Sequence, residues 1–288
     1  MSKEESKHRP SSLSPRYCKI TDPSAQGRER GARTFATISM SPSTDVRENR
    51  EFASEFKFMV ARSLAPEIRE WARGCLQPDP NASGETQDTY RITSLYFDTP
   101  TFDVFHRRGS FGRSKYRIRQ YGQSEVAFLE RKLKTRGLVS KRRSAVLIND
   151  LPALTAPQIQ RLWQGYWFHR RLLARKLSPV CQIRYDRMAR VAMTQYGPIR
   201  MTIDDNLRAV PISGITFTPE QGELLLADHV ILELKFRLEM PLLFKQLVEQ
   251  FALNFSTISK YRLGVAGVGM VSESPANPVA GKLGNVYA

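Results

Sequence analysis

Basic side chains occupy every second position of a short segment in the middle of the chain, where they could bind phosphate. In SKYRIRQYG, Lys115, Arg117 and Arg119 alternate with Tyr116 and Ile118. Alternate residues of a β-strand point to opposite faces, so the three cations would share one face. Arginine can bind two phosphate oxygens at once, and lysine adds a compact charge. The spacing therefore predicts a strand that presents a basic face to an anion.

The same alternation recurs in other segments of the chain. The residues that would share a face are Glu130, Lys132 and Lys134; Lys141 and Arg143; Tyr185 and Arg187; Arg200, Thr202 and Asp204; and Glu233, Lys235, Arg237 and Glu239. In the last of these segments, HVILELKFRLEM, the residues on the other face are all apolar: Val230, Leu232, Leu234, Phe236 and Leu238. Each segment thus predicts a strand with one apolar and one charged face.

Two interpretations of these charged faces are open for any single strand. An antiparallel sheet commonly exposes one face to water, so each charged face could be a solvated surface. Alternatively, about eight such strands could close into a barrel with the charges inside. Two like charges about 6 Å apart repel by roughly 2–3 kcal/mol at an effective dielectric near 20, so an inward basic cluster requires water and an anion. Because lysine and arginine dominate these faces, the sequence favours the barrel and a polyanionic ligand.

Glutamates also stand among the cations and need an explanation. Glu233 could hold a divalent metal against phosphate oxygens, or it could form a salt bridge with a neighbouring lysine or arginine. The residues alone leave both open. For Glu130 the salt bridge is the favoured interpretation. Asp98, which precedes Thr-Pro, is expected to start a turn rather than to bind a metal.

Composition narrows the class of partner and the compartment. The net charge of +16 favours polyanions such as nucleic acid, acidic membranes, nucleotides or polyphosphate. The three widely spaced cysteines suit neither a disulfide scaffold nor a zinc site, so a cytoplasmic protein is expected. No apolar run is long enough for a transmembrane segment. The aromatics nearest the basic positions, Tyr116 and Phe236, fall on the opposite strand face, so no specific nucleic-acid partner is expected.

The elements that would position these side chains are mostly strands. The segments expected to be strands are 50–60, 89–100, 114–122, 125–134, 138–148, 178–193, 197–210 and ILELKF, and the helical segments are 63–76, 156–176 and 241–254. This pattern predicts an α+β fold: an antiparallel β tunnel barrel of about eight strands with a few flanking helices. Residues 1–48 are expected to be disordered, residues 49–270 to form the domain, and residues 271–288 to be a flexible tail.

The order of these short segments resembles that of a known family. The segments are EFKF, SLYFDT, KYRIRQYG, FLERKLK, SKRR, YDRMA, IRMTIDDNL, LELKF and SKYRLG. Together they resemble the VTC domain, the polyphosphate polymerase domain of the vacuolar transporter chaperone proteins and a member of the triphosphate tunnel metalloenzymes, over roughly residues 50–268. The resemblance implies a tunnel that binds ATP and inorganic polyphosphate. It also implies transfer of the γ-phosphate of ATP to a growing chain, with Mn²⁺ or Mg²⁺ as the metal.

The resemblance further implies roles for individual residues. Those expected to be catalytic are Arg117, Arg119, Lys132 and Lys260, of which the first three would stabilise the transferring phosphoryl group and Lys260 would clamp the nucleotide or the chain. Those expected to bind phosphate or nucleotide are Lys57, Lys141, Tyr185, Arg187, Arg200 and Ser259. Glu233 resembles the glutamate that binds the metal.

The chain departs from the pattern in two respects, and alternatives remain. The ExExK signature of the superfamily is partial, since Glu55 and Lys57 are present but position 53 is alanine. The SPX domain and transmembrane helices of the eukaryotic complexes are not expected in this chain, so a membrane-bound partner stays open. One alternative is a tunnel-type triphosphatase that hydrolyses triphosphate or a nucleoside triphosphate. The other is a non-catalytic polyphosphate-binding module, which would have no need of Glu233.

Overall fold

The structure is a computed structural model that describes residues 46–48, 54–80, 82, 88–135, 138–158 and 160–271. The chain divides into Met1–Ile38 and Ser39–Ala288, and all the described residues belong to the second unit. The segments expected to be disordered or flexible, 1–48 and 271–288, lie outside the described residues except for residues 46–48 and 271. None of the helices in the described part of the chain has the length and hydropathy needed to cross a bilayer.

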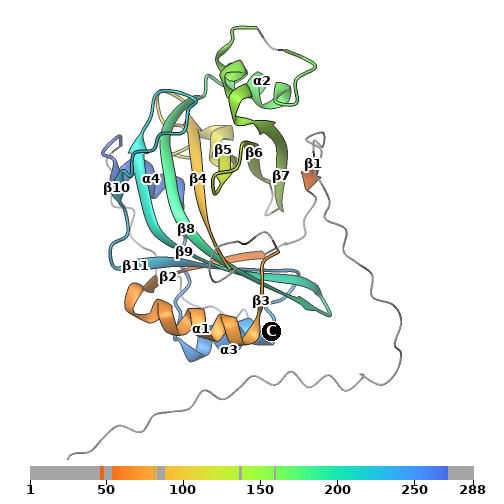
Figure 1. Ribbon diagram of the computed structural model, residues 1–288, viewed down its shortest axis with the longest axis vertical. Coiled ribbons are helices and arrows are strands. Elements are labelled where there is room, and N and C mark those ends of the chain that lie inside the picture. The colour runs from red at the N-terminus through yellow and green to blue at the C-terminus, as the bar shows by residue number, and fades with distance from the viewer. Residues whose placement is uncertain are drawn as a thin grey trace, which may run out of the picture. The chain divides into compact units, whose positions relative to one another are not determined.

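The strands form one antiparallel sheet, which confirms the predicted fold class (Figure 1). In sheet order the strands are β1 (Val46–Glu48), β7 (Leu138–Leu147), β6 (Val126–Thr135), β5 (Ser114–Tyr121), β4 (Thr89–Asp98), β8 (Ser178–Thr194), β9 (Gly197–Pro211), β11 (His229–Phe236) and β2 (Ser54–Ala61). The short strands β3 (Gln77–Pro78) and β10 (Glu223–Leu224) pair with β8 and β9. The predicted hairpins β5–β6 and β8–β9 are both present.

The sheet curls but does not close, which corrects the expectation of a closed barrel. Within the described residues no backbone pairing joins β2 to β7 or β1, the strands at the opposite edge. The free edge of β2 is covered by the connection that follows α3 instead. Phe255 forms a bridge with Phe58, and the Ser256 N–H donates to the Lys57 carbonyl at 2.8 Å. This connection therefore occupies the edge of β2 at Lys57 and Phe58.

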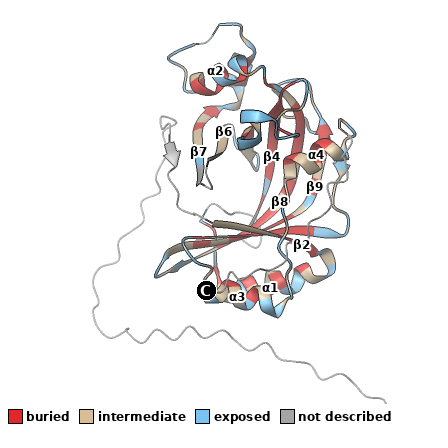
Figure 2. Cartoon of the chain, turned by 180° about the vertical axis from the view of Figure 1, so that it is seen from behind, coloured by how far each residue is buried: buried red, intermediate tan, exposed pale blue. Residues whose placement is uncertain are grey.

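Two helices cover the outer side of the sheet at β2, β9 and β11. These helices are α1 (Ala65–Cys75) and α3 (Leu242–Gln250), which lie below β11 and β2 in Figure 1. Their buried residues, such as Ile68 and Phe244, share a core with Phe58, Leu234 and Phe236. In Figure 2, β8 and β9 are mostly buried, whereas α1 and α3 alternate buried and exposed residues. The apolar face of the ILELKF strand therefore packs against helices, and its charged face points to the other side of the sheet.

A third helix, α4 (Lys260–Gly267), packs on the face of the sheet that carries the charges. Tyr261 stacks on Tyr96 of β4 with 5.4 Å between ring centroids. Gly264 lies so close to β8 that an added Cβ would be 2.6 Å from Ile183 Cδ1. The absence of a side chain at Gly264 favours this close approach, which brings the first turn of α4 next to the charged strands.

The predicted helical segment 156–176 is helical only in α2 (Tyr166–Ala174). It is preceded by turns and by the 3₁₀ helix η3 (Ile148–Thr155); two further 3₁₀ helices are η1 (Arg62–Leu64) and η2 (Gly109–Arg113). The ring of Trp163 folds over Gly165, where a Cβ would lie 2.1 Å from a ring carbon. Glycine also costs about 1 kcal/mol inside a helix, so the helix begins after Gly165 rather than before it.

Asp98 organises the turn that follows β4, as its sequence context predicts. The buried carboxylate accepts hydrogen bonds from the backbone N–H groups of Thr99, Val104 and Phe105 at 2.7–2.9 Å. The hydroxyl of Tyr261 also donates to it. This carboxylate therefore ties the turn after β4 to the helix that borders the charged face.

Replacing Tyr261 by phenylalanine is expected to lower the free energy of unfolding by about 1.5–3 kcal/mol. The change removes a hydrogen bond to a carboxylate and leaves part of its acceptor capacity buried and unused. Denaturant unfolding would measure the difference. Tyr196→Phe, at the exposed turn between β8 and β9, is the matched control and should change stability by less than about 0.5 kcal/mol. Equal stabilities of the two variants would contradict this role of Tyr261.

Candidate functional site

Mostly charged side chains from β2, β5, β6, β7, β8, β9, β11 and the start of α4 converge on one face of the curled sheet. The strand register brings them together. Glu233 of β11 lies opposite Lys57 of β2 and Thr202 of β9. Arg117 of β5 lies opposite Glu130 of β6. We name these residues the charged cluster: Glu55, Lys57, Lys115, Arg117, Arg119, Glu130, Lys132, Lys141, Arg143, Tyr185, Arg187, Asp204, Glu233, Lys235, Ser259 and Lys260.

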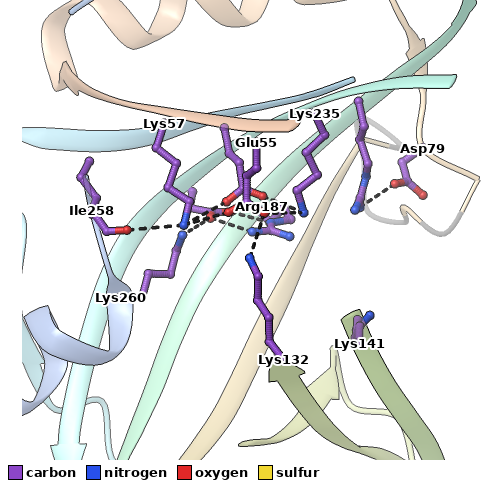
Figure 3. A network of polar contacts seen from close by, with 12 residues as sticks. Glu55, Lys57, Asp79, Lys132, Lys141, Arg187, Lys235, Ile258 and Lys260 are labelled. Carbon is purple, nitrogen blue, oxygen red and sulfur yellow. Dashed lines mark hydrogen bonds and ion pairs between the residues drawn. The ribbon is translucent and has the colours of Figure 1, made fainter. Parts of the chain in front are cut away.

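At the centre of the charged cluster, two glutamates share two lysines (Figure 3). Lys57 Nζ lies 3.0 Å from Glu55 Oε1 and 3.6 Å from Glu233 Oε2. Lys235 Nζ lies 2.8 Å from Glu233 Oε1 and 3.6 Å from Glu55 Oε2. Burial by itself would raise the pKa of the Glu55 carboxyl, but the surrounding lysines lower it to about 2. They also hold the pKa of Glu233 well below its usual value against its burial. Both carboxylates are therefore charged at neutral pH.

One ion pair joins strands that are far apart in the sheet. Lys132 extends from β6 towards β2, and its Nζ lies 3.1 Å from Glu55 Oε2 (Figure 3). These two strands have no backbone pairing with each other. The curled sheet thus brings its two ends together through side chains rather than through backbone hydrogen bonds.

Glu130 is surrounded by cations. Its oxygens lie 2.6 Å from Arg117 Nε, 2.9 Å from Arg143 Nε and 3.3 Å from Lys141 Nζ, and the side chain is 2% exposed. Burial would raise the pKa of this carboxyl, but Arg117, with other cations, holds it well below its usual value. The salt-bridge interpretation of Glu130 therefore agrees with its contacts.

Asp204 pairs with two cations to which the sequence analysis assigned roles: Arg187 was expected to bind phosphate and Lys260 to be catalytic. Arg187 Nε and Nη2 bind its two oxygens at 2.6 and 2.7 Å, and Lys260 Nζ lies 2.6 Å from Oδ2. Burial would raise the pKa of Asp204, but Arg187 and Lys260 lower it to about 2. Asp204 therefore holds two side chains from different elements in one place.

Arg119 is buried without a carboxylate partner in the described part of the chain. It is 5% exposed, and it donates to the hydroxyl oxygens of Ser94 at 3.2 Å and Tyr185 at 3.1 Å. Lys115 is only half-buried, but its Nζ likewise contacts the Ser259 hydroxyl at 2.8 Å and no described carboxylate. Buried charges in proteins are normally paired, so these two residues mark where a bound anion would supply the missing charge.

The structure brings together nearly all the residues predicted from the sequence. Lys57, Arg117, Arg119, Lys132, Lys141, Tyr185, Arg187, Glu233, Ser259 and Lys260 all belong to the charged cluster. Arg200 lies at its margin, where its Nη2 contacts Asp79 at 2.7 Å and the Tyr90 hydroxyl at 2.8 Å. The sequence analysis placed Lys115, Arg143, Asp204 and Lys235 on charged faces but assigned them no role. Ser94 was missed, because β4 has no alternating charges that would mark its inner face.

The carboxylates available to a metal are few. Among the described residues there is no group of three or more histidine, cysteine, aspartate or glutamate side chains placed to hold one. Mg²⁺ is often bound by one or two carboxylates together with the phosphates of a substrate, and Glu55 with Glu233 fits that case. The hydroxyl of Thr202, which lies opposite Glu233, is buried and has no hydrogen-bond partner among the described residues. A hydrated metal or a phosphate beside Glu233 would satisfy it.

Comparisons with known proteins add a family match. A family model described as the VTC domain matches residues 52–268. No curated protein matches the chain. Solved structures similar to it include a proposed adenylate cyclase of Bacillus halodurans, at 12% identity over 71% of this chain and 92% of the other, with a TM-score of 0.44. A proposed adenylyl cyclase of Hippeastrum with a dominant triphosphatase activity is 15% identical over 74% and 95%, with a TM-score of 0.45. Similarities this distant have no bearing on the activity of the chain.

Proposed function

Because the chain belongs to the VTC domain family, we propose that it is an ATP-dependent polyphosphate polymerase. In this proposal the charged cluster binds the phosphates of ATP and of inorganic polyphosphate. The γ-phosphate of ATP is transferred to the end of the polyphosphate chain, and ADP is released. The reaction needs no nucleophile from the protein, which suits a site built of cations and a few carboxylates.

The burial of Arg119 without a carboxylate partner is the observation that supports this proposal most. A guanidinium taken out of water is costly unless an opposite charge accompanies it. Its hydrogen-bond partners in the described chain are neutral oxygens. Arg117 lies beside it on the same strand face, and Glu130 neutralises the charge of Arg117 only in part, because Glu130 also contacts Arg143 and Lys141. A chain of phosphates supplies negative charge along the whole row of cations, which a single small anion does not.

The proposed mechanism rests on positioning and on charge. A terminal oxygen of the acceptor chain attacks the γ-phosphorus in line, and the bond from phosphorus to the bridging oxygen of ADP breaks. Arg117 and Arg119 bind oxygens of the transferring group, and Lys132 adds a charge from the opposite side. Arg187 and Lys260, held in place by Asp204, bind neighbouring phosphates. Lys57, Lys141, Tyr185, Arg200 and Ser259 complete the contacts to nucleotide and chain.

A divalent metal, Mn²⁺ or Mg²⁺, would be held by Glu233 with Glu55 beside it. When bound, it would neutralise charge on the phosphate oxygens it contacts. In the structure, Lys57 and Lys235 form ion pairs with these carboxylates. The two lysines would therefore exchange the glutamates for phosphate oxygens when the substrate binds. Position 53 is alanine, so it supplies no further carboxylate to this site.

Incubation of the purified protein with ATP and Mn²⁺ tests the proposal. Polyphosphate chains resolved on a gel are the expected product, with ADP formed in equal amount to the phosphate incorporated. Orthophosphate without chains would identify a tunnel-type triphosphatase instead. Binding of polyphosphate without any turnover of ATP would identify a non-catalytic binding module. Either of these two results would overturn the polymerase proposal.

A further inference from the structure

A small cavity lies within the charged cluster, between β5, β6 and β7. It has a volume of about 50 Å³, and it is lined by Lys115, Arg117, Glu130, Lys132 and Lys141. One water molecule needs only about 10–15 Å³ of such space. The single carboxylate in the lining already contacts Arg117 and Lys141. The cavity is therefore larger than a single water requires, and its wall carries an excess of positive charge.

Lys115 differs from the other lysines around this cavity. Lys132 pairs with Glu55 and Lys141 with Glu130, whereas the Nζ of Lys115 contacts the hydroxyl of Ser259 and no carboxylate in the described part of the chain. Burial is the largest influence on Lys115 and lowers its pKa. Neighbouring cations lower this pKa further, to about 7. These cations are Lys57 of β2, Lys132 of β6, Arg107 in the segment before η2, and Arg117 of β5.

We propose that this cavity binds one phosphoryl unit of a polyphosphate chain, and that Lys115 gains a proton from solvent as that unit enters. The step is a protonation only: the amine becomes an ammonium, and no bond to phosphorus forms or breaks. The proposal rests on the proposed function in one respect, that the ligand is a chain of phosphates.

The physical reason is the balance of charge before and after binding. Without a ligand, a neutral amine at position 115 relieves repulsion among Arg117, Lys132 and Lys57. A phosphoryl group in the cavity reverses this balance, because its negative oxygens stabilise the ammonium form. Binding is therefore coupled to proton uptake, and the affinity for the chain falls as the pH rises above about 7. By linkage, the fall reaches at most about tenfold per pH unit for one proton.

Titration calorimetry with inorganic tripolyphosphate tests the coupling in the full chain, without nucleotide or metal. Each titration is run at pH 8 in two buffers of different ionisation enthalpy, so that the difference in heat gives the number of protons taken up. The comparison is with Lys115→Arg, which keeps the charge at both pH values. The protonation changes of tripolyphosphate itself are common to both proteins and cancel in the difference.

We expect the wild-type protein to take up close to one proton more than Lys115→Arg at pH 8, and the difference to vanish at pH 6. Lys115→Arg should bind up to about tenfold more tightly than the wild type at pH 8 and equally at pH 6. Lys115→Gln tests the same point without a larger side chain: it should bind more weakly at pH 6 and lack the extra proton at pH 8. Lys176→Arg, on the exposed end of the α2 segment, should behave as the wild type.

Two results would overturn the inference. Equal proton uptake by the wild type and both Lys115 variants, with tripolyphosphate bound in each case, would show that Lys115 does not change protonation on binding and would leave the proposed function intact. No binding of tripolyphosphate to the wild type at either pH would overturn the inference and the proposed function together.

Discussion

Arg119→Ala is expected to reduce the initial rate of ATP-dependent polyphosphate formation by about 10²–10³-fold. Losing one preorganised donor to a developing negative charge typically costs this much in an enzyme. Arg119 is well placed for such a role, because Ser94 and Tyr185 orient its guanidinium and no described carboxylate competes for it. Arg119→Lys should recover only part of the rate, since an ammonium keeps the charge but cannot bind two oxygens in parallel.

The same substitution should change the stability of the protein only slightly. Removing Arg119 relieves its repulsion with Arg117, but it also removes hydrogen bonds to Ser94 and Tyr185 and the attraction of Glu130. The control is Arg91→Ala on the other face of β4, where the side chain is 58% exposed and pairs with Asp186 at 3.0 Å. This control should retain the wild-type rate. A wild-type rate in Arg119→Ala, or a large loss of stability without loss of rate, would contradict the assignment.

Glu130→Gln is expected to lower the free energy of unfolding by about 3–5 kcal/mol. The amide has nearly the same shape, but it removes the charge shared by Arg117, Arg143 and Lys141 and leaves these half-buried cations close together around a buried neutral group. Removing one partner of a buried ion pair typically costs this much. Denaturant unfolding at neutral pH would measure the loss, and the rate of polymer formation should fall with it because Arg117 loses its anchor.

The matched control for this variant is Glu125→Gln, at an exposed position in the turn just before β6. It should change the free energy of unfolding by less than about 0.5 kcal/mol. Tripolyphosphate should stabilise Glu130→Gln at least as strongly as it stabilises the wild type, since its oxygens would supply part of the missing negative charge. If Glu130→Gln were as stable as Glu125→Gln, Glu130 would not be the counter-charge of this part of the site.

The comparison between sequence and structure is most informative at β5 and β11. Alternation alone placed Lys115, Arg117 and Arg119 on one face, and it placed Glu233 opposite the apolar residues of its strand. Alternation follows directly from strand geometry, so it holds wherever a strand forms. Whether such a face points to water or to other strands depends on the curvature of the whole sheet, which no single segment encodes.

Other features were not accessible from the sequence for similar reasons. The closed barrel was wrong, because residues 255 and 256, far from β2 in the sequence, occupy the edge of that strand. The shorter helix at α2 follows from the packing of Trp163 over Gly165, a contact that helical periodicity does not reveal. Asp204 was placed on a charged face, but its contacts with Arg187 and Lys260 depend on side chains from two other elements.

Local pattern by itself determined the long strands of this protein, which face of each of them is charged, and the family that the ordered segments resemble. These properties depend only on residues that are close together in the sequence, so they can be predicted without the fold. Only the tertiary structure decided which charges are neutralised and which are not. Glu130 and Asp204 each form ion pairs with two or more cations, whereas Lys115 and Arg119 form hydrogen bonds with hydroxyl groups. That division depends on distances between strands brought together by folding, because electrostatic energy depends on separation in space rather than on order along the chain.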